Sequence, residues 1–250
     1  MLYAKLHTYT DISGAQQTSI AATNTQPDAT WVAYDVNNAD QLEIVNGAIQ
    51  IVSSSTQLAT TLASAQADQI TLLYGATTDP ANTSFNSSMN QDVTITTAGG
   101  VTKAFQATEH AQSMVAKSLT NCSAAGTVPT GFYWVATDNT QVPFTLADLK
   151  TLAAAIFAQS WAVFQKMQNY KDTIMGVTSM ASWTASNAQV LNDQIVDGSG
   201  NIYKCTTAGT TAATAPVWPT SPTTATTVTD GTVVWTFVQT QLNAIQTVTW

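Results

Sequence analysis

The stretch from Phe144 to Ile174 constrains the fold most, because its pattern fits one long helix and little else. Thr145-Leu146-Ala147-Asp148 reads as a helix N-terminus: a threonine side chain caps free backbone N–H groups, and an acid three residues on suits the positive end. No proline or glycine follows until Gly176. At about 1.5 Å per residue, the predicted helix is roughly 40 Å long.

Apolar residues recur along this predicted helix at the spacing of one broad stripe. They are Leu149, Leu152, Ala153, Ile156, Phe157, Phe164, Met167 and Ile174. Only 9% of the residues in the chain are charged, against about 25% in a typical soluble domain. Two interpretations stay open: an ordinary core helix, or a helix whose stripe also packs against other copies of the chain.

The residues before this helix predict a β-rich region followed by a helical one. In the β-rich region, residues 1–54, we expect strands over 2–9 and 31–34, a loop over 11–28, and a hairpin of 42–45 and 48–52 around Asn46-Gly47. In the helical region we expect helices over 56–74 and 108–119, a loop over 80–90, a hairpin of 93–96 and 101–105 around Gly99-Gly100, and an aromatic strand over 131–135.

Two motifs in this middle region carry a family resemblance. They are Trp134-Val135-Ala136-Thr137-Asp138-Asn139 and Val142-Pro143-Phe144-Thr145-Leu146-Ala147-Asp148-Leu149, the second leading into the Ala-rich helix. With the order helix, hairpin, helix, aromatic strand and long helix, residues 56–176 resemble an uncharacterised domain found in tail-fibre and other tail structural proteins of tailed bacteriophages. The resemblance implies a structural role and transfers no chemistry.

Residues 181–238 predict a separate small β module. Its signals are a hairpin of 193–197 and 201–205 around Gly198-Ser199-Gly200, the segment Ala215-Pro216-Val217-Trp218-Pro219, and the run Thr229-Asp230-Gly231-Thr232-Val233-Val234-Trp235. These motifs resemble the small carbohydrate-binding-like module of phage tail and head-fibre proteins, which is in turn similar to the chitin-binding modules of chitinases. Residues 239–250 read as a tail with one further strand.

Four aromatic residues of the module are the candidate ligand-binding residues: Trp183, Tyr203, Trp218 and Trp235. Aromatic faces stack on sugar rings through flat apolar contact. The alternative is that these rings form the core of a small β domain, which has little else to bury. Trp218 lies between two prolines, which favours a ring held rigidly toward solvent.

The charge, the histidine positions and the missing motifs of the sequence argue against several classes of function. All seven basic residues are lysine and the net charge is −8, whereas nucleic-acid binding needs clustered Lys and Arg. The two histidines, His7 and His110, fall in different predicted parts, so we expect no metal site and no cofactor. Nucleophile elbows and phosphate-binding glycine loops are missing from the sequence. We expect a protein that is not an enzyme.

The sequence has few features that indicate the cellular compartment of the protein. Cys122 and Cys205 are the only cysteines; sequence does not decide between a disulfide and two thiols, and we expect free, mostly buried thiols. Met1-Leu2-Tyr3-Ala4-Lys5 begins a strand-like stretch, so we expect no signal peptide. No run of 18 apolar residues is present, and we expect no membrane insertion.

The sequence thus predicts an α+β multi-domain protein with a β-rich docking region (1–54), a central α+β domain with the long helix (55–178), an antiparallel β module (179–238) and a tail (239–250). The functional hypothesis is a bacteriophage virion structural protein, a tail-fibre component acting in host-surface attachment by binding. The alternative is a head-decoration, neck or other tail structural protein without a host ligand. The expected partners are further copies of the chain in a homo-oligomer, other tail or head proteins, and host-surface glycan. The resemblance implies that the homo-oligomer is a trimer. The expected location is the virion, after synthesis in the host cytoplasm.

Overall fold

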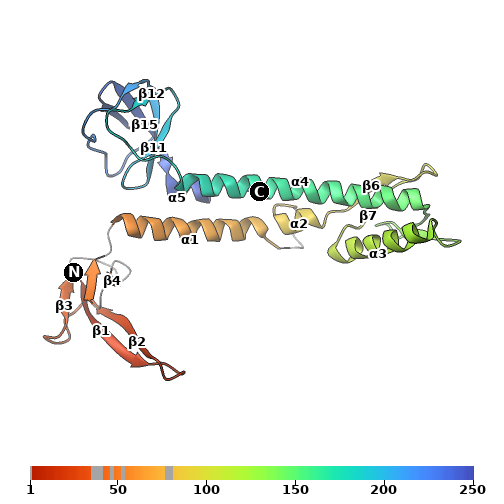
Figure 1. The fold of residues 1–250 in the computed structure, drawn as a ribbon, viewed down its shortest axis with the longest axis horizontal. Helices are drawn as coiled ribbons and strands as arrows, with labels where there is room; N and C mark the ends of the chain where they lie inside the picture. The colour runs from red at the N-terminus through yellow and green to blue at the C-terminus, as the bar shows by residue number, and fades with distance from the viewer. Residues whose placement is uncertain (1, 35–41, 46–47, 52–53, 77–80) are drawn as a thin grey trace. The chain divides into compact units, whose positions relative to one another are not determined.

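The computed structural model describes residues 2–34, 42–45, 48–51, 54–76 and 81–250 (Figure 1). The chain divides into two compact units, one made of residues 1–64 and 180–242 and the other of residues 65–179 and 243–250. Helices and small antiparallel sheets occur together, which confirms the α+β class. The four-part domain division stays a prediction.

The N-terminal strands form a three-stranded sheet and a separate hairpin. The strands are β1 (Leu2–Thr10), β2 (Gln16–Thr23), β3 (Val32–Tyr34), β4 (Leu42–Val45) and β5 (Ala48–Ile51). Pairing of Val45 with Ala48 confirms the predicted hairpin, although its turn residues Asn46 and Gly47 lie outside the described residues.

The predicted loop over 11–28 is wrong in its middle, where β2 pairs with β1 along its whole length. The sequence Gln-Gln-Thr-Ser-Ile-Ala-Ala-Thr has one large apolar residue, Ile20, so it shows no alternation. Pairing with β1, which places Ile20 opposite Leu6, makes it a strand. The connecting turn is built on Asp11, whose carboxylate accepts hydrogen bonds from the backbone of Ser13 and Ala15.

The second unit is built on helices and two short hairpins. Its elements are α1 (Ser54–Tyr74, which begins in the first unit), α2 (Phe85–Met89), β6 (Val93–Thr96), β7 (Thr102–Phe105), α3 (Glu109–Ala125), β8 (Tyr133–Val135), β9 (Gln141–Pro143) and α4 (Leu146–Thr178). Both predicted helices and the 93–105 hairpin are confirmed. The predicted loop over 80–90 is wrong at α2, which is short and begins at a Ser84 cap that accepts from the Ser87 N–H.

The long helix α4 begins as the sequence predicts. Thr145 accepts from the Asp148 N–H, and the Asp148 carboxylate accepts in return from the Thr145 N–H. The same carboxylate also accepts from the Ala98 N–H at 2.6 Å, which ties the helix N-terminus to the turn after β6. Burial opposes ionisation of Asp148, but the bonds from Thr145 and Ala98 outweigh it and hold its pKa below the ordinary value.

One apolar core joins the hairpins, α3 and the first half of α4. Its buried members are Val93, Ile95, Phe105, Ala107, Val115, Cys122, Ala136, Val142, Phe144, Leu149, Leu152 and Ile156. Further along α4, Met167 and Ile174 are also buried. Five residues of the predicted stripe are therefore buried, which confirms that α4 is a core helix.

The C-terminal module is a four-stranded antiparallel sheet in the order β11-β12-β15-β14, with a short β10-β13 pair. The strands are β10 (Ala188–Gln189), β11 (Gln194–Val196), β12 (Asn201–Thr207), β13 (Gly209–Thr210), β14 (Thr227–Asp230) and β15 (Val233–Thr240). The predicted 193–205 hairpin is confirmed. Cys205, on β12, is a buried free thiol, as is Cys122 on α3.

The further strand expected within 239–250 is wrong, because those residues form α5 (Gln241–Gln246) after the end of β15. Leu242 and Ile245 are three residues apart, which is a helical spacing, and Ile245 is fully buried. Among the described residues, no helix has the length and apolarity needed to cross a membrane.

Candidate functional site

The four predicted ligand-binding residues lie together around one apolar cluster in the C-terminal module. Tyr203 and Trp235 are fully buried members of it, whereas Trp183 and Trp218 are half-buried and pack against it. Neither face of the Tyr203 or Trp235 ring is therefore available to stack on a sugar in this structure. Only Trp183 and Trp218 present surface, and ligand binding by the four residues stays a prediction.

Asp230 fixes two of the indoles. Its Oδ2 accepts from Trp183 Nε1 at 2.8 Å and from Trp235 Nε1 at 3.0 Å, and its Oδ1 accepts from the Ala212 N–H at 2.8 Å. The side chain is almost completely buried. A buried carboxylate with three donors is a strong orienting group, since hydrogen bonds to a charged acceptor are shorter and stronger than neutral ones. Trp183 is thus held at one angle although part of it faces solvent.

Trp218 lies over Tyr203, with ring centroids 4.7 Å apart. The Tyr203 hydroxyl is buried and has no hydrogen-bond partner among the described residues. Burial, together with the nearby Asp197 carboxylate, raises the pKa of this phenol to about 12, so it is neutral at physiological pH. Next to Trp218, Val217 is 94% exposed, which places this loop at the surface of the module.

A second aromatic site lies on α4. Phe157, Trp161 and Phe164 are 69%, 50% and 43% exposed, and the Trp161 and Phe164 rings stack with centroids 5.6 Å apart. We call these three residues the α4 seam. The sequence placed Phe157 and Phe164 in the same stripe as Leu149, but the structure leaves them outside the core.

A groove of about 530 Å³ lies between α3 and α4 beside this seam. Its lining is mainly apolar and includes Val115, Leu119 and Ile156, and Phe157 belongs to both the groove and the seam. The seam therefore has a recess directly beside it on the same unit.

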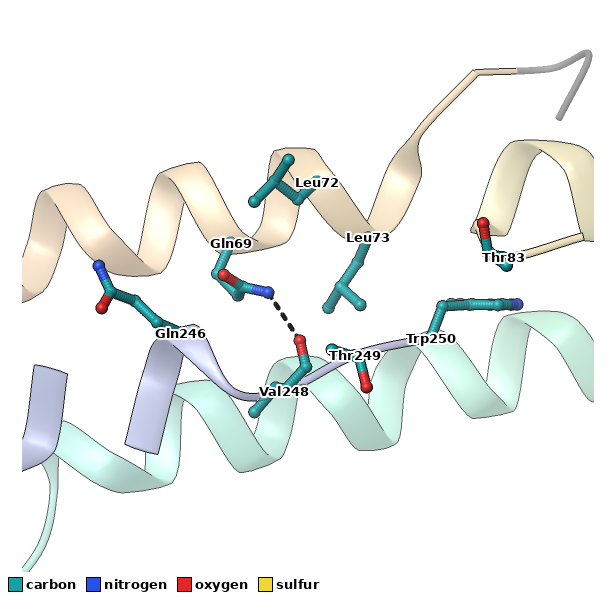
Figure 2. A pocket seen from close by; sticks show the side chains of 8 residues that line it. All are labelled: Gln69, Leu72, Leu73, Thr83, Gln246, Val248, Thr249 and Trp250. Carbon is teal, nitrogen blue, oxygen red and sulfur yellow. Dashed lines mark hydrogen bonds between the residues drawn. The ribbon is translucent and has the colours of Figure 1, made fainter. Parts of the chain in front are cut away.

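A third feature is the groove of about 470 Å³ along the C-terminal segment shown in Figure 2. Gln69 on α1 donates a hydrogen bond from Nε2 to the Val248 carbonyl at 2.6 Å. Trp250 anchors the segment: its Nε1 donates to Ser88 Oγ at 2.9 Å, and the Lys166 ammonium lies 4.3 Å from its ring centroid. Contacts within the chain therefore hold the wall of this groove in place.

Metal-ligating side chains are the remaining candidates for a functional site. Within the part of the chain that the structure describes, no group of three or more His, Cys, Asp or Glu side chains is placed to hold a metal ion. His7 lies on β1 and stacks on Tyr9, and His110 lies in the first turn of α3. The predicted absence of catalysis stays a prediction.

Two residues with clear roles were missed by sequence reasoning. Asp230 enters the sequence analysis only as one residue of the run from Thr229 to Trp235, although a buried acid five residues before a tryptophan can reach the indole N–H. Trp250 was assigned to a tail, and no local signal links it to Ser88, which is 162 residues away in the sequence.

Comparison with known proteins gives one family match. A family model described as "Domain of unknown function (DUF4376)" matches residues 87–194, which is less than half of the chain. The matched range contains the α4 seam, the groove beside it and Trp183, but not Tyr203, Trp218 or Trp235. The comparison with curated proteins and the comparison with solved structures each return no match.

Proposed function

We propose that this chain is a structural protein of the virion of a tailed bacteriophage, a tail-fibre component that acts in host-surface attachment by binding rather than catalysis. Two findings support the virion assignment. The sequence resemblance over residues 56–176 and the family match over residues 87–194 overlap on the same helical region. The C-terminal residues, which resemble a phage fibre module, fold as a small antiparallel sheet.

The observation that carries the attachment role is the state of Trp218. It is half-buried on Tyr203 at 4.7 Å, in a surface loop between Pro216 and Pro219. A ring that is fixed before binding loses little conformational entropy on contact, which favours stacking on a sugar. Trp183, fixed by Asp230, is the second indole with exposed surface. Host-surface glycan is the ligand class that this chemistry suits.

A second candidate function has its own supporting observation. Complete burial of Tyr203 and Trp235 makes those rings the core of the module, and a module of that kind also suits a head-decoration, neck or other tail structural protein with no host ligand. In either role the chain works through contacts with other virion proteins and with further copies of itself.

Phage particles carrying Trp218→Ala in the full chain test the attachment role, with Val217→Ala as the matched control in the same loop. We expect Trp218→Ala to reduce adsorption to host cells several-fold with unchanged particle yield and heat stability, and Val217→Ala to leave adsorption unchanged. Normal adsorption with Trp218→Ala would refute the ring as a contact residue. A label at the C-terminus that images on the head instead of the tail would favour the second candidate.

Catalysis is tested separately with the purified chain. Incubation with host polysaccharide should leave the chain-length distribution of the polysaccharide unchanged, because binding by stacked rings cleaves no bond. Shortening of the polysaccharide would overturn the non-catalytic assignment.

A further inference from the structure

We infer that the α4 seam is a self-association surface, and that its occupant is the α4 helix of a second copy of this chain. The inference rests on the homo-oligomer of the proposed function but not on the attachment role. It names the surface and the residues through which copies meet.

The spacing of the seam fits a helix as its partner. Counted from Ala154, the seam residues Phe157, Trp161 and Phe164 follow at intervals of three, four and three residues, and Ala154 and the seam residues are all exposed. Apolar side chains at alternating three- and four-residue intervals form the strip along which one α-helix packs against another. A flat sugar or an extended peptide does not need that period.

Charge favours an identical helix over other partners. Residues 151–165 of α4 contain no charged residue, and charged residues resume only at Lys150 on one side and Lys166 on the other. Two copies that meet at the same helix bring equivalent residues near one another, so a neutral strip avoids like-charge repulsion. Each chain carries a net charge of −8, so two copies repel each other overall.

The α4 seam of one copy and the groove beside the seam of another copy are also complementary in shape. The protruding rings lie beside the groove of about 530 Å³ between α3 and α4, which has room for aromatic side chains of a neighbouring copy. With roughly 200 Å² for a whole aromatic side chain, the exposed fractions of the three rings leave on the order of 300 Å² of aromatic surface per copy. That surface is a central anchor, and the flanking α3 and α4 surface has to supply the rest of an interface of about 800 Å² per partner.

The test is the mass of the full chain in solution, by sedimentation equilibrium from about 1 to 200 μM. For the wild type we expect a concentration-dependent rise to a whole multiple of 26.4 kDa. Trp161→Lys should raise the dissociation constant by about 100-fold, as expected for a central aromatic anchor. Phe157→Lys should weaken association in the same direction, while circular dichroism shows unchanged helix content in both variants.

Leu72→Lys is the matched control, because Leu72 is 68% exposed on another helix and belongs to neither the seam nor its groove. It should leave the dissociation constant unchanged. A wild-type mass of 26.4 kDa at every concentration would overturn the inference. An oligomer that neither seam variant weakens would overturn it too. None of these results bears on adsorption through Trp218, so the attachment role fails or stands separately.

Discussion

Removing the Asp230 carboxylate should loosen the whole C-terminal module, because one side chain accepts from three donors there. Asp230→Ala leaves the Trp183 and Trp235 indole N–H groups and the Ala212 N–H without their acceptor. A hydrogen bond to a charged acceptor contributes about 1.5 to 3 kcal/mol, and these three share one carboxylate and are not additive. Loss of the desolvation cost of the buried charge offsets part of the total. We therefore expect the free energy of unfolding of the module to fall by about 3 to 5 kcal/mol.

A double-mutant cycle with Trp183→Phe isolates one of these bonds. Phenylalanine keeps an aromatic ring but cannot donate, so the single variant should cost about 1 to 2 kcal/mol. The double variant should be little worse than Asp230→Ala alone, which gives a coupling energy of about 1 to 2 kcal/mol. The control is Asp193→Ala, since the Asp193 side chain accepts from one exposed backbone N–H, that of Val190.

Hydrogen exchange read by mass spectrometry is the suitable assay, because it reports the opening of β12, β14 and β15 separately from the helical unit. The Asp230→Ala variant should exchange faster in these strands and unchanged in α3 and α4, whereas the Asp193 control should stay near wild type. A loss below 1 kcal/mol in β12 and β15, or no coupling with Trp183→Phe, would refute the view that Asp230 fixes the indoles.

Three further predictions concern other parts of the fold. Asp148→Asn should make the loss of stability at acid pH less steep, as measured by urea titrations from pH 7 to pH 2. The pKa of Asp148 is lowered in the folded state, so its contribution to the free energy of unfolding is present above about pH 4 and is lost as the pH falls through the folded pKa. Trp250→Ala should destabilise the helical unit by about 2 kcal/mol and speed hydrogen exchange in α2, because Trp250 packs on Phe85 and is half-exposed. Gly231→Ala should lower the free energy of unfolding by about 2 to 3 kcal/mol, and with it the melting temperature, because the φ of Gly231 is +61° and a Cβ there would lie 2.4 Å from the Thr210 carbonyl oxygen. The control Gly198→Ala, which has open space around it, should be near neutral.

The sequence predicted those elements whose signals are local. The start of α4 depends on Thr145 and Asp148, three residues apart, and the 93–105 hairpin on its own alternation and glycine turn. By contrast, β2 has only Ile20 as a large apolar residue and becomes a strand through its pairing with β1. Such an element depends on a neighbouring strand, so a reading of its own residues assigns it to a loop.

The candidate site was predictable in membership but not in exposure. All four aromatic residues meet at one cluster, as their shared module implied, yet period-two alternation does not tell which face of a strand is covered in the folded module. Tyr203 and Trp235 lie on the paired central strands β12 and β15 and are covered, whereas Trp218 comes from a loop and remains partly uncovered.

The stripe on α4 shows how a sequence pattern can combine two surfaces. At 100° per residue, the buried residues Leu149, Ile156 and Met167 centre on one direction, and the seam lies about 100° further round the same helix. Because the two faces adjoin, their apolar residues read as one broad stripe.

A core-facing stripe needs a little over 100° of the helix circumference, so apolar residues that cover about twice that arc exceed what the core of the unit uses. In a chain with 9% charged residues the excess does not reflect a general shortage of polar residues either, since eight of the other fourteen exposed positions of α4 are polar or charged, among them Thr151, Gln165 and Asn169. The width of the stripe is therefore the sequence signal for a second packing surface, and the seam is where the structure leaves that surface uncovered.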